Sequence, residues 1–188
     1  MKKVVFAFAL IVTALGIFSF TSKVGDGDVY KVNTSKSKID FIGSKTEGYH
    51  SGAFSLKSGE LTVENGRIIA GKFSIDLNSL KITDSAGERL ETHLKSPDFF
   101  DLSKSTEANY YISNVKYISD TKAEVDGILT LNRITSSVKF VANIRGIDDK
   151  KLFAEASFIL DRSAFGMGYG KGLIANDVQI YVHLFANK

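Results

Sequence analysis

Apolar and polar side chains alternate along most of this chain, from about residue 30 to the C-terminus. The clearest alternations fall at residues 123–131, 138–144, 152–160 and 178–186. Because successive side chains of a strand point to opposite faces, a period of two predicts strands with one apolar and one polar face. An antiparallel sheet of this kind buries its apolar face by curling up or by stacking on a second sheet. We therefore expect an all-β protein, an antiparallel barrel of about eight strands with an apolar interior.

Turn signals separate the expected strands. We expect strands over residues 29–32, 38–44, 53–63, 67–77, 108–118, 122–132, 136–146, 152–161 and 177–185. Asn65 and Gly66 lie between two alternating segments, and Asn-Gly in that place is a strong hairpin signal. Residues 46–52 are expected to form a loop, and the glycine-rich residues 166–172 a mobile loop at one end of the barrel.

One passage changes its period and predicts a short helix over residues 86–96, near the barrel mouth. Apolar side chains recur there every fourth residue, on one helical face: Ala86, Leu90 and Leu94. A side-chain oxygen of Asp84 or Ser85 can cap the start. Pro97 ends the helix, because the residue before a proline avoids helical geometry.

The first residues have the layout of an export signal. Lys2 and Lys3 precede an apolar run over residues 4–20. We expect residues 1–21 to be a signal peptide, with an uncleaved N-terminal anchor as the alternative. Residues 22–28 would then be a flexible leader and residues 29–188 the barrel domain. The expected location is periplasmic or secreted.

Composition suits one globular domain and excludes several kinds of chemistry. The 188 residues are 44% hydrophobic and 24% charged. The absence of cysteine excludes disulfides, thiolate metal sites and a lipid-modified cysteine. Without Lys2 and Lys3 the formal net charge falls from +3 to +1. We expect no nucleic-acid partner, and there is no basic block for strong binding of anionic headgroups.

Four short segments occur in an order that resembles the YceI-like family of exported bacterial lipid-binding proteins. They are HLKSPDFFD (93–101), DGILTL (126–131), LDRSAFGM (160–167) and NDVQI (176–180). The resemblance covers about residues 29–186 and implies a lipocalin-like barrel that holds a long isoprenoid-like lipid, such as a polyprenyl chain or quinone tail. It implies transport or storage of that lipid in the cell envelope, with transient membrane contact. Relatives often carry glycine where this chain has Thr92.

The residues expected to bind the lipid are apolar side chains on inward strand positions and near the mouth. They are Phe41, Phe73, Ile75, Leu94, Phe99, Phe100, Leu129, Phe140 and Phe158. An eight-stranded barrel can also be filled entirely by its own side chains. Small inward residues favour a cavity instead: Gly43, Gly71, Gly127, Ala142, Ala154 and Ala156. From the residues alone both readings stay open, and the family resemblance favours the cavity.

Few residues suggest any other chemistry. His93 is a candidate for contact with a lipid headgroup, or else caps or packs the helix end. His50 and His183 show no metal-ligand spacing, so no metal is expected, and no cofactor other than the lipid ligand. Asp161 and Arg162 are expected to form a structural ion pair or turn.

Two other functions remain as alternatives. An enzyme would need titratable groups that converge on the cavity, and the inward positions are nearly all apolar, so we expect no enzyme. A filled barrel could instead act through its surface, as a protein-interaction or stress-related module without lipid. The oligomeric state stays open, a homodimer included.

Overall fold

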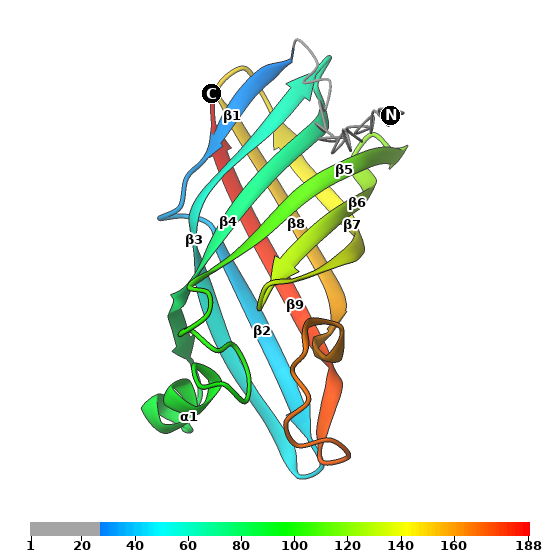
Figure 1. The fold of residues 1–188 in the computed structure, drawn as a ribbon. Helices are drawn as coiled ribbons and strands as arrows, with labels where there is room; N and C mark the ends of the chain where they lie inside the picture. The colour runs from blue at the N-terminus through cyan, green and yellow to red at the C-terminus, as the bar shows by residue number, and fades with distance from the viewer. Residues whose placement is uncertain (1–26) are drawn as a thin grey trace, which may run out of the picture.

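The computed structural model describes residues 27–188, so the expected signal peptide and most of the expected leader lie outside the described residues. Figure 1 shows an elongated barrel of strands with one short helix at one end. The strands are β1 (Asp28–Val32), β2 (Lys38–Lys45), β3 (Gly48–Glu64), β4 (Arg67–Ile82), β5 (Glu107–Ser119), β6 (Lys122–Leu131), β7 (Ile134–Ile147), β8 (Lys151–Asp161) and β9 (Ile174–Asn187). The helices are α1 (Gly87–Leu94) and the 3-10 helix η1 (Arg162–Phe165).

The sheet closes on itself, and the prediction of an all-β antiparallel barrel is confirmed. Strands β2 to β9 are joined in the order β3-β2-β9-β8-β7-β6-β5-β4, and β4 pairs back with β3. All these pairings are antiparallel. The long β3–β4 ladder contains three shifts of register. Such irregularities bend a strand locally, which a closed barrel needs.

Strands β1 and β2 together occupy one position between β3 and β9. β1 pairs with the later part of β3 and the end of β9, where Val32 lies opposite Ala186. β2 pairs with the earlier part of both strands. At the step between β1 and β2, the buried Ser37 hydroxyl accepts the N–H of Phe185 at 2.9 Å and donates to its carbonyl at 3.1 Å. This serine replaces ladder hydrogen bonds where the strand is interrupted.

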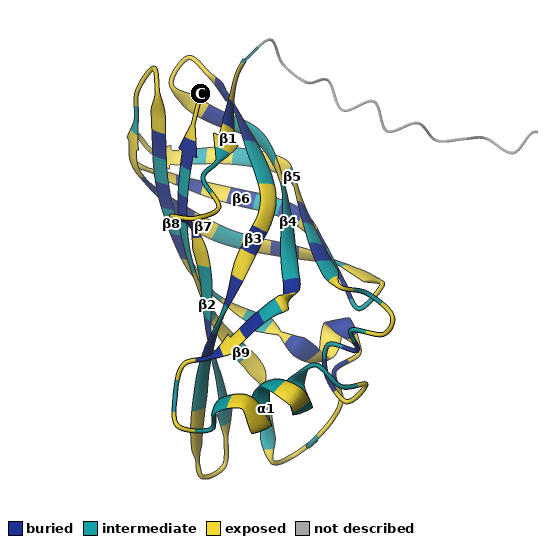
Figure 2. Cartoon of the chain, turned by 90° about the vertical axis from the view of Figure 1, so that its left-hand side faces the viewer, coloured by how far each residue is buried: buried dark blue, intermediate teal, exposed yellow. Residues whose placement is uncertain are grey.

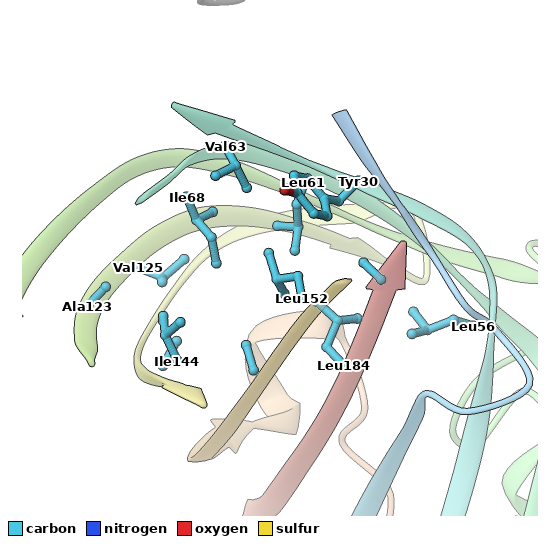
Figure 3. Close-up of a cluster of buried hydrophobic side chains, with 13 residues drawn as sticks. Tyr30, Leu56, Leu61, Val63, Ile68, Ala123, Val125, Ile144, Leu152 and Leu184 are labelled. Atoms are coloured by element: carbon cyan, nitrogen blue, oxygen red, sulfur yellow. The ribbon is translucent and has the colours of Figure 1, made fainter. Parts of the chain in front are cut away.

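A cluster of buried apolar side chains closes one end of the barrel (Figure 3). Leu152 and Leu61 are only 1% and 2% exposed there. The Tyr30 ring packs in the same cluster, and its hydroxyl donates to the Asp148 carbonyl at 2.6 Å. The cluster closes this end, where Figure 1 also places the C-terminus.

The prediction of a loop over residues 46–52 is wrong. β3 begins at Gly48, so a tight turn joins β2 to β3 and the hairpin extends to its tip. Gly52 is paired within the strand, where a Cβ would lie 2.5 Å from the Phe41 ring. Its lack of a side chain allows close packing of a ring, whereas the sequence made it look like a turn residue.

The helix is shorter than predicted, and its start lacks the side-chain cap expected from Asp84 or Ser85. α1 begins at Gly87 rather than Ala86. The Asp84 carboxylate accepts the Ala86 N–H at 2.8 Å, just before the helix. The helix ends at Leu94, three residues before Pro97.

The glycine-rich segment after β8 is organised around a buried arginine. Asp161 caps η1 by accepting the Ser163 N–H at 2.8 Å, so the expected turn is present. The Arg162 side chain forms no ion pair with Asp161 and bonds backbone carbonyls instead. Mobility of residues 166–172 stays a prediction.

Candidate binding cavity

The barrel interior contains a cavity of about 310 Å³. Its wall is built by inward side chains of β2 to β9, together with side chains of α1 and the segments beside it. The apolar residues expected from the sequence all lie on this wall: Phe41, Phe73, Ile75, Leu94, Phe99, Phe100, Leu129, Phe140 and Phe158. The interior is therefore not filled by its own side chains. That these residues contact a lipid stays a prediction.

Aromatic rings form a continuous part of the wall. Phe140 stacks on Phe158 with ring centroids 4.7 Å apart, and Tyr110 lies 5.8 Å from Phe140. The Phe73 ring stacks against Tyr110 at 6.4 Å. The rings come from β4, β5, β7 and β8, so the closure of the barrel brings them together. Their faces offer a flat, apolar surface to a ligand.

Small residues make room in two different ways. Gly43, Ala142 and Ala154 lie on the cavity wall, where their size leaves space. Gly127 is covered instead by Tyr110, whose ring would lie 2.2 Å from a Cβ at position 127. Ala156 also lies on the cavity wall. Gly71 is covered by a neighbour, as Gly127 is, because a Cβ at position 71 would lie 2.8 Å from the Leu61 side chain.

Tyr110 is the most deeply buried ionisable ring on the wall. Its hydroxyl donates to the Val138 carbonyl at 3.2 Å. Burial raises the pKa of Tyr110 well above its usual value, so the phenol stays neutral over the physiological range. It therefore adds no charge to the cavity.

The cavity reaches solvent at the end of the barrel that carries α1. The exposed residues Lys45 and Ala175 lie on its wall there. The opposite end is lined by Leu61, Ile68 and Leu184 of the packed cluster. The cavity thus has an inner end lined by the buried cluster and a mouth at the α1 end.

Helix α1 and the residues after it form one side of the mouth. Leu90 and Leu94 of α1 line the cavity, but α1 contains no buried residue (Figure 2). Its main polar link to the barrel is Glu91, whose carboxylate accepts the Ile82 N–H and the Lys81 ammonium, each at 3.0 Å. These two donors hold the pKa of Glu91 below its usual value. The Glu91 carboxylate therefore links α1, which has no buried residue, to β4.

Phe99 and Phe100 follow the helix and are held more firmly. The Phe100 ring meets Phe54 edge-on at 5.2 Å. Asn132 donates from Nδ2 to the Phe99 carbonyl at 2.7 Å, and Phe99 is 8% exposed. This segment is therefore packed more tightly against the barrel than α1, which has no buried residue.

Arg162 supports the other side of the mouth. Its guanidinium donates to the carbonyls of Ala175 at 2.9 Å, Met167 at 2.7 Å and Tyr169 at 2.8 Å. The residue is 5% exposed, and desolvation lowers the pKa of Arg162. These bonds place Met167 on the cavity wall. The arginine thus shapes the segment between η1 and β9.

The headgroup candidate His93 lies beside the mouth and not on the cavity wall. Its Nε2 is 2.9 Å from the Asp98 carboxylate, and its ring meets Tyr169 edge-on at 4.8 Å. The ring thereby joins the end of α1 to the segment before β9. Thr92, where relatives often have glycine, is exposed and donates to the Glu88 carbonyl at 2.9 Å. Contact of His93 with a headgroup stays a prediction.

Sequence reasoning missed several wall residues: Phe54, Leu90, Tyr110, Val138, Met167 and Ile180. Alternation could have found most of them, since Tyr110 follows Ala108 on the same face of β5. Met167 had no such signal, because it lies in an irregular segment. His50 also lines the cavity, with Nδ1 3.2 Å from the Asp84 carboxylate.

The wall offers little for catalysis or metal binding. Nearly all of its side chains are apolar. Among residues 27–188, no group of three or more histidine, aspartate or glutamate side chains could hold a metal ion. No helix in the described part of the chain is long and apolar enough to span a membrane.

A closed antiparallel barrel with an apolar cavity and one mouth is the architecture of lipocalin-like binding proteins. A family model described as "YceI-like domain" matches residues 30–186. The chain belongs to the YceI-like family, as its four short segments predicted.

Known relatives and structures agree with this assignment. A UPF0312 protein of Pseudomonas putida (strain W619) is 34% identical over 95 residues, which is 50% of this chain and 49% of the relative. The chain thus matches about half the length of that relative. A UPF0312 protein of Pseudomonas aeruginosa (strain LESB58) is 28% identical over 180 residues, covering 91% of this chain and 93% of the relative.

Two solved structures share the fold. The crystal structure of Burkholderia cenocepacia BcnA has a TM-score of 0.72 at 22% identity and covers 82% of this chain and 99% of its own. A polyisoprenoid binding domain from Saccharophagus degradans, implicated in plant cell wall breakdown, has a TM-score of 0.68 at 15% identity. That match covers 84% of this chain and 97% of the domain.

Proposed function

We propose that this protein binds a long apolar lipid of isoprenoid or quinone type inside its barrel and carries or stores it in the cell envelope. The observation that carries this proposal is the apolar cavity of about 310 Å³, whose wall reaches exposed residues beside α1. The polyisoprenoid binding domain with the same fold supports the lipid class. The apolar wall and the expected export signal support a non-enzymatic role in the periplasm or outside the cell.

The energetics favour exchange with a membrane over irreversible capture. Each methylene of such a lipid that moves from water into the cavity is worth ~0.8 kcal/mol, so a long chain taken from water would be held very tightly. The lipid starts in a bilayer, however, where its chain is already buried. Transfer into the cavity is therefore nearly neutral, and shape and chain entropy decide its direction.

Helix α1 is the element that admits the lipid in this proposal. It has no buried residue, and it covers the mouth with Leu90 and Leu94. Movement of α1 away from β4 needs the release of Glu91, of these two apolar contacts and of the His93 ring from Tyr169. Phe99 and Phe100 stay in place and form the fixed edge.

Native mass spectrometry of the purified protein, followed by organic extraction, tests the proposal. We expect a stoichiometric adduct whose mass has the repeating pattern of isoprene units. A ligand-free mass that does not change after incubation with polyprenyl lipids and quinones would overturn it and favour a surface-based role.

Substitution at the fixed edge tests where the lipid enters. Phe100→Asp places a charge on the cavity wall, which is unfavourable for an apolar chain. We expect lipid co-purification to fall at least about tenfold, since desolvation of a carboxylate costs several kcal/mol. Phe100→Leu and the exposed Tyr111→Asp are the controls and should keep their lipid. Unchanged lipid in Phe100→Asp would remove this segment from the entry path.

A further inference from the structure

Among residues 27–188, the two most exposed large apolar side chains belong to neighbouring segments beside the mouth. Leu173 is 69% exposed and Tyr49 is 67% exposed. Tyr49 follows the β2–β3 turn, and Leu173 immediately precedes β9. The Thr46 N–H donates to the Leu173 carbonyl at 3.0 Å, so the two segments are joined. We call residues 45–49 and 169–173 together the docking tip.

The docking tip is the far end of the barrel. In Figure 1 the β2–β3 turn and the orange segment before β9 extend beyond α1, at the end opposite the C-terminus. An object that meets this end of the barrel touches the tip first. Isolated apolar residues on a protein surface are ordinary, but two on joined segments at one protruding end form a contact point.

The docking tip borders the mouth of the cavity. Lys45 and Ile174 lie opposite each other in the β2–β9 ladder, and both line the cavity. Tyr169, 45% exposed, packs its ring against His93 at the end of α1. A surface bound to the tip would therefore lie next to the place where the lipid enters.

The charges of the docking tip favour an anionic surface. It contains Lys45 and Lys171 but only one acidic residue, Glu47. Neither lysine forms an ion pair with any carboxylate of residues 27–188. Lysines near a bilayer are attracted by anionic lipids, and tyrosine rings favour the interface between headgroups and acyl chains.

We infer that the docking tip inserts shallowly into the surface of an anionic phospholipid bilayer and places the mouth of the cavity against it. This inference rests on the proposed carrier function and names its membrane-contact site. Two apolar side chains and two lysines give weak, reversible binding, which suits repeated exchange. A protein partner or a second copy of the chain would be expected to bury a broader apolar face than this tip offers.

Vesicle flotation tests the inference with the protein as purified from the cell envelope. The vesicles contain phosphatidylcholine and phosphatidylglycerol in equal amounts, or phosphatidylcholine alone. We expect the protein to float with the anionic vesicles, less so at high salt, and much less with the neutral ones. The double variant Tyr49→Ser/Leu173→Ser should bind at least about tenfold more weakly, since it loses the buried apolar area.

The opposite end of the barrel supplies the control. Val29→Ser/Ile118→Ser also removes two exposed apolar side chains, which are 41% and 50% exposed. This variant should bind vesicles as the unchanged protein does. All three proteins share the same residues before Gly27, so those residues cannot cause a difference between them.

Several outcomes would overturn the inference. They are no binding of the unchanged protein to anionic vesicles, equal binding by the tip variant, or equal loss in the control variant. A smaller mass in solution for the tip variant, without loss of vesicle binding, would show a contact between copies instead. Lipid content is measured in parallel: docking without bound lipid would contradict the carrier function alone, whereas bound lipid without docking would contradict only this inference.

Discussion

At the scale of single residues, glycine has two opposite uses in this barrel. Gly127 makes room for the Tyr110 ring, which fills the space where a side chain would be. Gly43 has no atom within 4 Å of where its Cβ would lie, and it faces the cavity. Both glycines occupy inward positions of alternating strands. One contributes to packing and the other to the space available for a ligand.

A pair of substitutions separates these uses. Gly127→Ala should lower the free energy of unfolding by about 1–3 kcal/mol, because its Cβ would overlap Tyr110 and displace a buried ring. Gly43→Ala meets no neighbour and should change stability little or raise it slightly. Urea unfolding of both variants measures the difference. Equal stability of the two would show that Tyr110 relaxes without cost.

At the scale of elements, α1 is attached to the barrel mainly by charge and hydrogen bonds. Glu91 accepts the Ile82 N–H, and Asp84 accepts the N–H groups of Ala86 and Ser51 beside the helix start. These bonds hold the pKa values of both carboxyls below their usual values. Each carboxylate therefore stabilises the folded arrangement fully above its usual pKa, and this contribution is lost as pH falls through the lowered pKa.

Acid should therefore loosen α1. The usual pKa of Glu91 is 4.5, so we expect lipid transfer from the protein to acceptor vesicles to become faster below that pH. Glu91→Gln should transfer lipid faster already at neutral pH and show a smaller acid effect, with Asp84 as the remaining contributor. Fluorescence of a labelled lipid measures the rate. A Glu91→Gln protein with the original rate and pH profile would show that α1 is not the moving element.

At the scale of the whole molecule, closure of the barrel depends on an interrupted strand position. β1 and β2 share one place in the sheet, and Ser37 bridges the step between them to Phe185. Ser37 is 4% exposed, so its partner groups have no water to replace the hydroxyl. Ser37 therefore links the step between β1 and β2 to β9.

Loss of the Ser37 hydroxyl should weaken the entire barrel. Ser37→Ala leaves the Phe185 N–H without its partner, which costs about 1–3 kcal/mol of unfolding free energy, whereas the Phe185 carbonyl keeps the Asn33 N–H at 2.8 Å. Ser35→Ala, in the same turn but exposed, should cost less than about 0.5 kcal/mol. Thermal unfolding compares the two. A similar melting temperature for both variants would show that the contact between the β1–β2 step and β9 does not depend on this serine.

The class of fold could be read from the sequence because its signal is local. Alternation at a period of two is visible within a few residues, and a one-sided sheet has few ways to bury its apolar face. The Asn65-Gly66 turn, the end of α1 before Pro97 and all nine expected wall positions follow from such neighbouring residues. Local signals failed at Gly52, which the sequence placed in a loop. The glycine is needed there because the Phe41 ring packs against its backbone.

By itself, therefore, the sequence determined the class of fold, most of the strands, the family and many of the side chains that face inward. Only the tertiary structure decided that the interior holds a cavity, because that depends on how rings from separate strands share space around Gly127 and Gly43. Only the tertiary structure decided where the mouth lies and which contacts fix the segments around it. The Glu91 link to Ile82 and the Thr46 link to Leu173 join segments whose distance in space no periodicity encodes.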